Sequence, residues 1–228
     1  MSIATRFCAL GALIVALVMG LAACQTSGTL TAIATDEPDA TLTSWLAKPD
    51  GDGPFPAVVL LHGCSGTELN TSHRTVWRGL NNHAVLLNDY GYVTLIVDSF
   101  GPRSITDGCQ TGSKYHPVQI SDADAAFDHL ASLPFVDAER IGFVGLARDG
   151  GTALSLPMPK PYFVEVVHGR THAVAGNRTA GRDAQTRMLA FFAEHLGGPY
   201  PAEASKGVDA AGNSGFGDFL RAAFVLND

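Results

Sequence analysis

A glycine-rich turn at Gly145–Gly151 has the spacing at which a catalytic nucleophile would be expected, and it follows an apolar run at residues 140–144. A turn written G-x-S-x-G between a strand and a helix presents a serine nucleophile. Counting from the apolar run places Ala147 in the serine position, and counting back from the final glycine pair places Arg148 there. Neither side chain is a nucleophile. In a slipped register Asp149 takes the position, and a carboxylate can act as a covalent nucleophile.

A second glycine-rich turn begins with His62, Gly63 and Cys64, directly after the apolar run 57–61. Glycine in such a turn leaves backbone N–H groups free to stabilise negative charge that develops on a substrate oxygen. These three residues are therefore candidates for an oxyanion-binding turn. A tight strand-to-loop turn without a ligand is the alternative. Arg148, directly after the nucleophile position, is the candidate for a further oxyanion contact.

The elements that must position these turns alternate between apolar strands and amphipathic helices. The sequence predicts a pair of edge strands and four further strands, at residues 30–35, 40–46, 57–61, 92–97, 140–144 and 162–167. It predicts helices over residues 74–90, from a capping box at Ser121 and Asp124 onward, and over 181–196. This alternation indicates an α/β fold with a mostly parallel sheet flanked by helices. Ligands of such sheets bind at the carboxyl ends of the strands, where both turns fall.

Three segments together resemble the dienelactone hydrolase family of the α/β-hydrolases, in its secreted, lipoprotein branch. They read FPAVVLLHGCSG at residues 55–66, GYV followed by DSFGPR within 91–103, and PFVDAERIG at 134–142. The resemblance implies an α/β-hydrolase-like fold without a cofactor, acting on a small ester or lactone. It also implies that His172, after the strand predicted at 162–167, is the catalytic base, since a histidine pKa lies near working pH. His168 and His172 straddle a strand end and a glycine, so we expect no metal site there.

The triad acid of that family has no obvious counterpart in this chain. Only 20 residues separate Gly151 from His172, whereas one strand–helix–strand crossover needs about 30 residues. The sequence therefore predicts that strands are missing between the altered turn and the histidine, so that the sheet lacks inner strands or closes up around a gap. Asp98 and Asp183 are possible substitutes for the acid, although neither matches the family position.

The N-terminal segment resembles a bacterial lipoprotein signal peptide over residues 1–23. Arg6 precedes an apolar run, and the segment ends in Leu-Ala-Ala before Cys24. Cleavage there would leave acyl chains on Cys24, which would anchor the protein in a lipid bilayer. The residue after Cys24 is Gln25 rather than aspartate, which favours the periplasmic face of the outer membrane. An ordinary signal peptide with a chance cysteine is the alternative.

The rest of the chain suits one hydrolase-like domain over residues 24–197, followed by a flexible Gly/Ala-rich tail at 198–228. The formal net charge of the 228-residue chain is −7 and no cluster of lysines and arginines occurs, so nucleic-acid binding is not expected. Cys64 and Cys109 would remain after processing. They could form a disulfide in an oxidising compartment or stay as two small buried thiols.

Three functions are consistent with these residues. The first is hydrolysis of small carboxylic esters or lactones, impaired because Ala147 replaces the nucleophile. The second is a non-catalytic envelope lipoprotein that keeps a ligand-binding hydrolase pocket. The third is a truncated product without a selected activity. Restoring a nucleophile with Ala147→Ser is expected to raise ester turnover if the missing nucleophile alone limits the first function.

Overall fold

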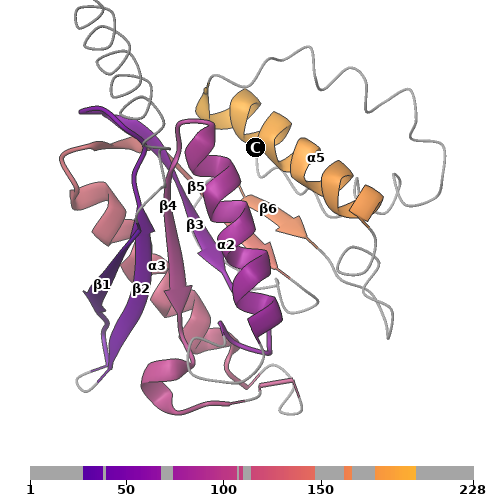
Figure 1. Ribbon diagram of the computed structural model, residues 1–228. Helices are drawn as coiled ribbons and strands as arrows, with labels where there is room; N and C mark the ends of the chain where they lie inside the picture. The colour runs from indigo at the N-terminus through magenta and orange to yellow at the C-terminus, as the bar shows by residue number, and fades with distance from the viewer. Residues whose placement is uncertain are drawn as a thin grey trace, which may run out of the picture.

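The computed structural model describes residues 28–37, 40–67, 74–106, 108–109, 114–146, 162–165 and 178–198. Their elements follow in the order β1 (Thr29–Ala34), β2 (Thr41–Ala47), β3 (Phe55–Leu61), α2 (Arg74–Asp89), β4 (Val93–Asp98), η1 (Gly101–Arg103), α3 (His116–Ser132), β5 (Val136–Leu146), β6 (Tyr162–Glu165) and α5 (Arg178–Leu196). Figure 1 shows one sheet with helices packed against it. The predicted α/β class is confirmed.

Within the described part of the chain, the sheet has six strands in the order β1-β2-β4-β3-β5-β6. β1 and β2 form an antiparallel pair, and β2 is also antiparallel to β4. The strands from β4 through β3 and β5 to β6 run parallel to one another. The sequence predicted both the edge pair and the parallel part, because runs buried on both faces are typical of parallel sheets.

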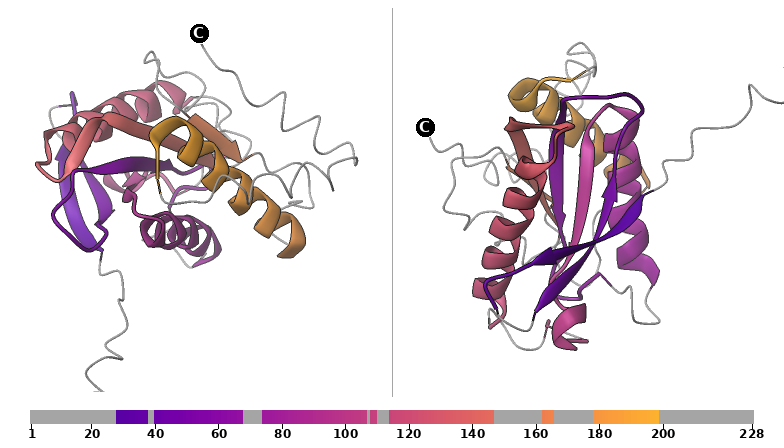
Figure 2. Two further views of the ribbon diagram at one scale, coloured as in Figure 1. Left: turned by 90° about the horizontal axis from the view of Figure 1, so that it is seen from above. Right: turned by 90° about the vertical axis from the view of Figure 1, so that its left-hand side faces the viewer.

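Alternate residues of the central strands supply two separate cores. On one face, Val59 of β3 and Leu95 of β4 pack in a cluster with Leu130 of α3. On the other face, Val58 and Leu60 of β3 pack with residues of α2 and α5. Figure 2 shows the sheet between α3 on one side and α2 on the other. The period of two along a strand therefore divides the same apolar run between the two faces.

β6 pairs directly with β5, in register from Phe143 with Tyr162 to Leu146 with Glu165. The described strands therefore pair directly across the interval between the altered turn and the expected histidine, and β6 is the outer strand of the sheet there. Of the two arrangements that the short 152–171 interval allowed, the structure has the closed one.

The predicted capping box at Ser121 is wrong. Helix α3 begins at His116, five residues earlier, and Pro117 occupies its first turn. Proline fits there because its fixed φ suits a helix and its missing N–H is not needed in the first turn. Ser121 and Asp124 consequently lie inside the helix rather than at its start.

Candidate active site

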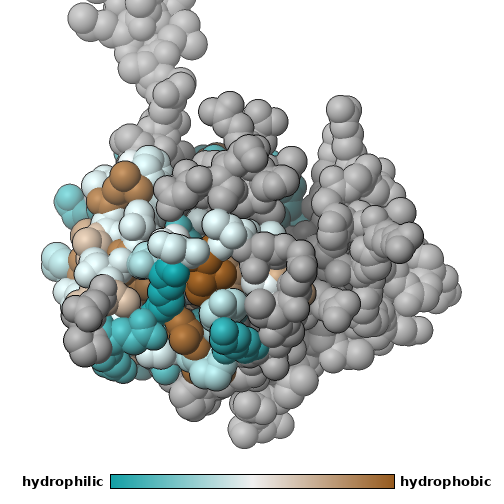
Figure 3. All heavy atoms as spheres, turned by 90° about the horizontal axis from the view of Figure 1, so that it is seen from below, coloured by the Kyte–Doolittle hydropathy of each residue, from teal (hydrophilic) through white to brown (hydrophobic). Residues whose placement is uncertain are grey.

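The candidate site lies where the parallel strands end. Leu61 of β3 is in register with Val97 of β4 and with Gly145 of β5, so the residues after these positions emerge at one edge of the sheet. His62 and Ser99 follow β3 and β4 at this edge. Figure 3 looks onto the same end of the molecule and shows hydrophobic residues between hydrophilic ones. Strand register therefore assembles the site.

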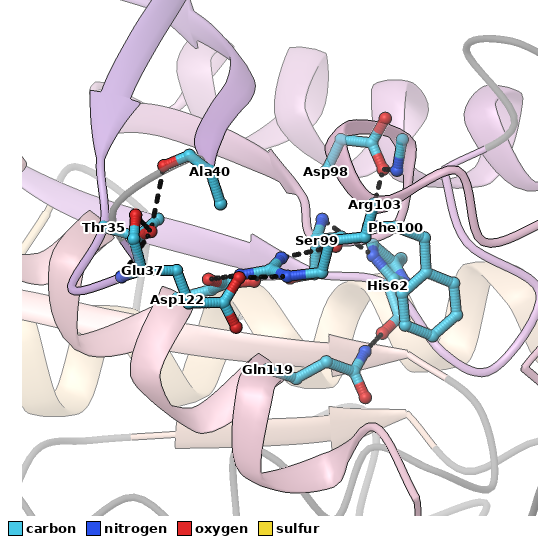
Figure 4. A network of polar contacts seen from close by, with 11 residues as sticks. Thr35, Glu37, Ala40, His62, Asp98, Ser99, Phe100, Arg103, Gln119 and Asp122 are labelled. Carbon is cyan, nitrogen blue, oxygen red and sulfur yellow. Dashed lines mark hydrogen bonds and ion pairs between the residues drawn. The ribbon is translucent and has the colours of Figure 1, made fainter.

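His62 connects the end of β3 to the end of β4 (Figure 4). Its Nε2 accepts a hydrogen bond of 3.1 Å from the backbone N–H of Ser99, and its Nδ1 lies 2.7 Å from the carbonyl oxygen of Gly63. These bonds are satisfied by the neutral ring that carries its proton on Nδ1. The Phe100 ring also packs on the imidazole in a T-shaped arrangement, at 4.6 Å between centroids.

Burial determines the charge state of His62. The residue is 2% exposed, and desolvation lowers its pKa below the ordinary value of 6.5. The hydrogen bond to the Gly63 carbonyl and the carboxylates of Asp98 and Asp122 oppose this shift. The ring is thus a neutral group that fixes the turn, and the backbone of the turn is left as the part that can bind a ligand oxygen.

The turn at Gly63–Gly66 presents a backbone donor. The N–H of Gly66 donates to the Gly63 carbonyl at 3.1 Å, and Gly66 has a φ of 76°, which favours glycine. Among the described residues, the N–H of Cys64 donates no hydrogen bond. Cys64 is only half-buried. A carbonyl oxygen of a ligand is the kind of partner that such a free donor takes.

A disulfide joins Cys64 to Cys109, so the structure has the first of the two states that the sequence left open. Beside it, the N–H of Gly108 donates to the Cys64 carbonyl at 2.8 Å. A Cβ on Gly108 would lie 2.8 Å from Phe100 Cε2 and 3.0 Å from that carbonyl oxygen. The close approach of this loop to the turn therefore requires glycine.

The Asp98 carboxylate accepts hydrogen bonds from the backbone that follows it. Its Oδ1 accepts hydrogen bonds from the N–H groups of Phe100 at 3.2 Å and Gly101 at 3.0 Å. The carboxylate thereby shapes the entry to η1. Asp183, the other possible substitute for the acid, lies in α5, and its side chain is outside the described part of the structure.

A buried ion pair braces this edge of the sheet, and sequence reasoning missed it. Arg103 forms two hydrogen bonds to Asp122, of 2.9 and 3.0 Å, and a third of 2.6 Å to the Ser99 carbonyl. Its Nε also contacts Glu37 at 3.0 Å. Desolvation raises the pKa of Asp122, opposed by its hydrogen bonds to Arg103 and Ser99. The DSFGPR segment contains Arg103, but the sequence does not indicate which residue pairs with this arginine.

Gln119 of α3 completes the support of the turn. Its side-chain amide donates to the His62 carbonyl at 3.1 Å, and the glutamine is 5% exposed. This contact joins residues 57 positions apart, so no local spacing could have indicated it.

The other predicted site residues lie outside the described residues. These are Ala147, Arg148, Asp149, His172 and the lipidation candidate Cys24. β5 ends at Leu146, immediately before Ala147, and β6 ends at Glu165, seven residues before His172. The last residues of both strands therefore lie at the edge of the sheet that carries His62.

Within the described ranges, no group of three or more His, Cys, Asp or Glu side chains is arranged to hold a metal ion. Among the helices described, none has the length and apolar character needed to span a bilayer.

The fold and the site define an α/β protein with a polar cluster at the carboxyl ends of its parallel strands. No protein-family model matches the chain. Similar solved structures include dienelactone hydrolase from Anabaena variabilis ATCC 29413, at 21% identity and a TM-score of 0.48, covering 74% of this chain and 70% of that one. The hypothetical protein PA2218 from Pseudomonas aeruginosa has 22% identity and a TM-score of 0.49, covering 73% and 54%.

The esterase Est1E from Butyrivibrio proteoclasticus is also similar, at 21% identity and a TM-score of 0.42, covering 56% of this chain. This chain spans 44% of the length of Est1E and 54% of PA2218. These are similarities of backbone structure. The α/β class itself rests on the sheet and helices described above.

Proposed function

We propose that the protein hydrolyses small carboxylic esters or lactones at the carboxyl edge of its sheet. The observation that carries the proposal is the N–H of Cys64, which donates to no residue that the structure describes, on a turn whose carbonyl groups are held by neighbouring elements. This donor is suited to the oxygen of a substrate carbonyl, which becomes negatively charged when the carbonyl carbon is attacked. The motifs that resemble dienelactone hydrolases support the same reaction class.

Water is the proposed nucleophile, because Ala147 has no reactive atom. In this proposal His172 takes a proton from water as the water oxygen attacks the carbonyl carbon. The N–H of Cys64, with that of Arg148, stabilises the resulting oxyanion. Collapse of this intermediate expels the alkoxide, which takes the proton from His172, and the products are a carboxylic acid and an alcohol. Base and oxyanion donors without a nucleophile still accelerate acyl transfer over water.

Hydrolysis of p-nitrophenyl acetate by the purified protein tests the proposal. We expect a rate well above buffer that falls at least tenfold in His172→Ala. Asp149→Asn is the matched variant, because it removes the other candidate nucleophile while keeping the shape of the side chain. A normal rate in Asp149→Asn supports water, and a lost rate assigns the attack to Asp149. Equal background rates for all three folded proteins would contradict the proposed hydrolysis.

Restoring a nucleophile gives a second test. We expect Ala147→Ser to increase kcat for the same ester by tenfold or more, since a serine beside a histidine base opens the acyl-enzyme route. Ala147→Gly is the control that changes the same position without adding a nucleophile. An unchanged kcat in Ala147→Ser would show that the serine lacks the geometry that the proposal assumes for this turn.

We also propose that Cys24 carries a lipid anchor in the periplasmic leaflet of the outer membrane. The Cys64–Cys109 disulfide supports an oxidising compartment. Cys24→Ala is expected to move the expressed protein from the membrane fraction to the soluble fraction. Retention of this variant in the membrane fraction would contradict the anchor.

A further inference from the structure

Cys64 supplies the backbone N–H that is the proposed oxyanion donor, and its side chain forms the disulfide with Cys109. We propose that Cys109 is a positioning residue for hydrolysis, and that reduction of this disulfide by a dithiol lowers kcat by releasing the turn. The proposal rests on the hydrolytic function proposed above. It adds a redox dependence that a donor on an unbridged turn would not have.

The two peptide groups on either side of the Cys64 α-carbon are held by different contacts. In a trans peptide the N–H points away from the preceding C=O, so fixing one fixes the other. The Gly63 carbonyl is held by His62 and Gly66, which sets the direction of the Cys64 N–H. The Cys64 carbonyl is held by the N–H of Gly108, which sets the following peptide. The disulfide fixes the atom at which the two peptides meet.

The loop that carries Cys109 is itself braced against the sheet edge. The N–H of Ile105 donates to the Phe100 carbonyl at 3.1 Å, and Phe100 packs on His62. Arg103, two residues before Ile105, is held by Asp122 of α3. A continuous set of contacts therefore runs from α3 through η1 and this loop to Cys64. The disulfide is the covalent link at the end of this set, beside the Gly108–Cys64 hydrogen bond.

The bond is accessible to a reductant, because Cys109 is exposed and Cys64 is half-buried. A thiolate of the dithiol attacks Sγ of Cys109, and Cys64 leaves as a thiolate that takes up a proton. The second thiol of the reductant then attacks the mixed disulfide and releases Cys109 as a thiol. Two electrons pass to the protein, two protein thiols form, and the dithiol becomes a disulfide.

Kinetics of p-nitrophenyl acetate hydrolysis with and without dithiothreitol test the proposal on the full chain. We expect reduction to lower kcat about tenfold and to change KM less than twofold, since a misplaced oxyanion donor weakens the transition state more than substrate binding. Cys109→Ser should show the reduced kcat and no response to dithiothreitol. Thr106→Ser, a conservative change of an exposed side chain in the same loop, should behave as the wild type does.

Hydrogen exchange supplies a readout that does not depend on activity. Reduction should speed amide exchange in peptides covering 62–67 and 100–109, while exchange in β4 stays slow. Unchanged exchange in both loop peptides, or faster exchange throughout the sheet, would overturn the positioning role. An unchanged kcat in an active, fully reduced protein would also overturn it. If the oxidised protein has no esterase activity, the proposed function fails, and the exchange result still decides whether the disulfide holds the turn.

Discussion

His62 illustrates how a single buried side chain can organise a turn through the hydrogen bonds of its own ring. Its two ring nitrogens have opposite roles, since Nδ1 donates to the Gly63 carbonyl and Nε2 accepts from the Ser99 N–H. Protonation of Nε2 would bring two N–H groups against each other in a buried place. The neutral ring is therefore required for the observed geometry, and the protein's stability should depend on pH through this residue.

The sign of that dependence follows from the lowered pKa of His62. At pH above 6.5 the imidazole is neutral in both states, and its contribution to stability is fully present. As pH falls from 6.5 toward the lowered folded pKa, only the unfolded chain takes up the proton. The free energy of unfolding should therefore decrease, by at most about 1.4 kcal/mol per pH unit from this group.

Urea unfolding at pH 7.5, 6.5 and 5.5 measures this slope, and His62→Gln should remove the part that belongs to His62. His129 is the matched comparison, because burial also lowers its pKa but it lies away from the turn, in α3. His129→Gln should leave the His62 part of the slope in place. The same slope in wild type and His62→Gln would contradict the assignment.

At the scale of elements, the pair of Arg103 and Asp122 joins η1 to α3 beside the turn. The Asp122 side chain is fully buried and that of Arg103 is 13% exposed. The guanidinium also bonds the Ser99 carbonyl and Glu37, so four acceptor oxygens in three segments of the chain depend on its planar fork. Removal of one partner leaves the other charge buried without compensation.

We expect Arg103→Met to lower the free energy of unfolding by about 3–5 kcal/mol. The double variant Arg103→Met/Asp122→Leu should lose less than the sum of the two single variants, because it leaves no unpaired charge. Chemical denaturation of the four proteins gives this double-mutant cycle. The partly exposed pair Arg140–Asp137 provides the control and should show little coupling. Additive losses for Arg103 and Asp122 would refute the bracing role.

The elements of the sheet were predictable because each strand has a strong local signature, such as the apolar run of β3. The start of α3 was not, since Ser121 and Asp124 match a capping pattern that the earlier Pro117 overrides. The residues of the candidate site also differ in whether the sequence could predict them. Spacing after β3 indicated His62 through Cys64, whereas the contacts of Gln119 and Arg103 join distant segments and have no local pattern.

At the scale of the molecule, the disulfide closes a large part of the chain into a loop. Cys64 and Cys109 are 45 residues apart, and the loop contains α2, β4 and η1. A cross-link of this span removes entropy from the unfolded chain worth about 4 kcal/mol in the chain-entropy model. The same bond that positions the turn is thus expected to stabilise the domain.

Cys109→Ser should lower the free energy of unfolding by about 2–4 kcal/mol relative to the oxidised wild type. Urea denaturation followed by circular dichroism, with and without dithiothreitol, measures the difference. Reduced wild type should resemble Cys109→Ser, and Thr106→Ser should match the oxidised protein. Equal unfolding midpoints for oxidised and reduced wild type would contradict this expectation.

The direction of β1 has a consequence for where substrate comes from. Ala32 is in register with Thr43, and Thr43 with Asp98, so β1 runs toward the edge that carries the site. A lipid on Cys24 would hold the start of β1, at Thr29, within about 17 Å of the bilayer. Thr29 is in register with Leu46, and Leu46 with Leu95, so such an anchor would attach at mid-height of β4, three residues from the level of Asp98. A tether this short would therefore keep the proposed site near the membrane surface, where esters at the surface would reach it as well as esters in the aqueous compartment.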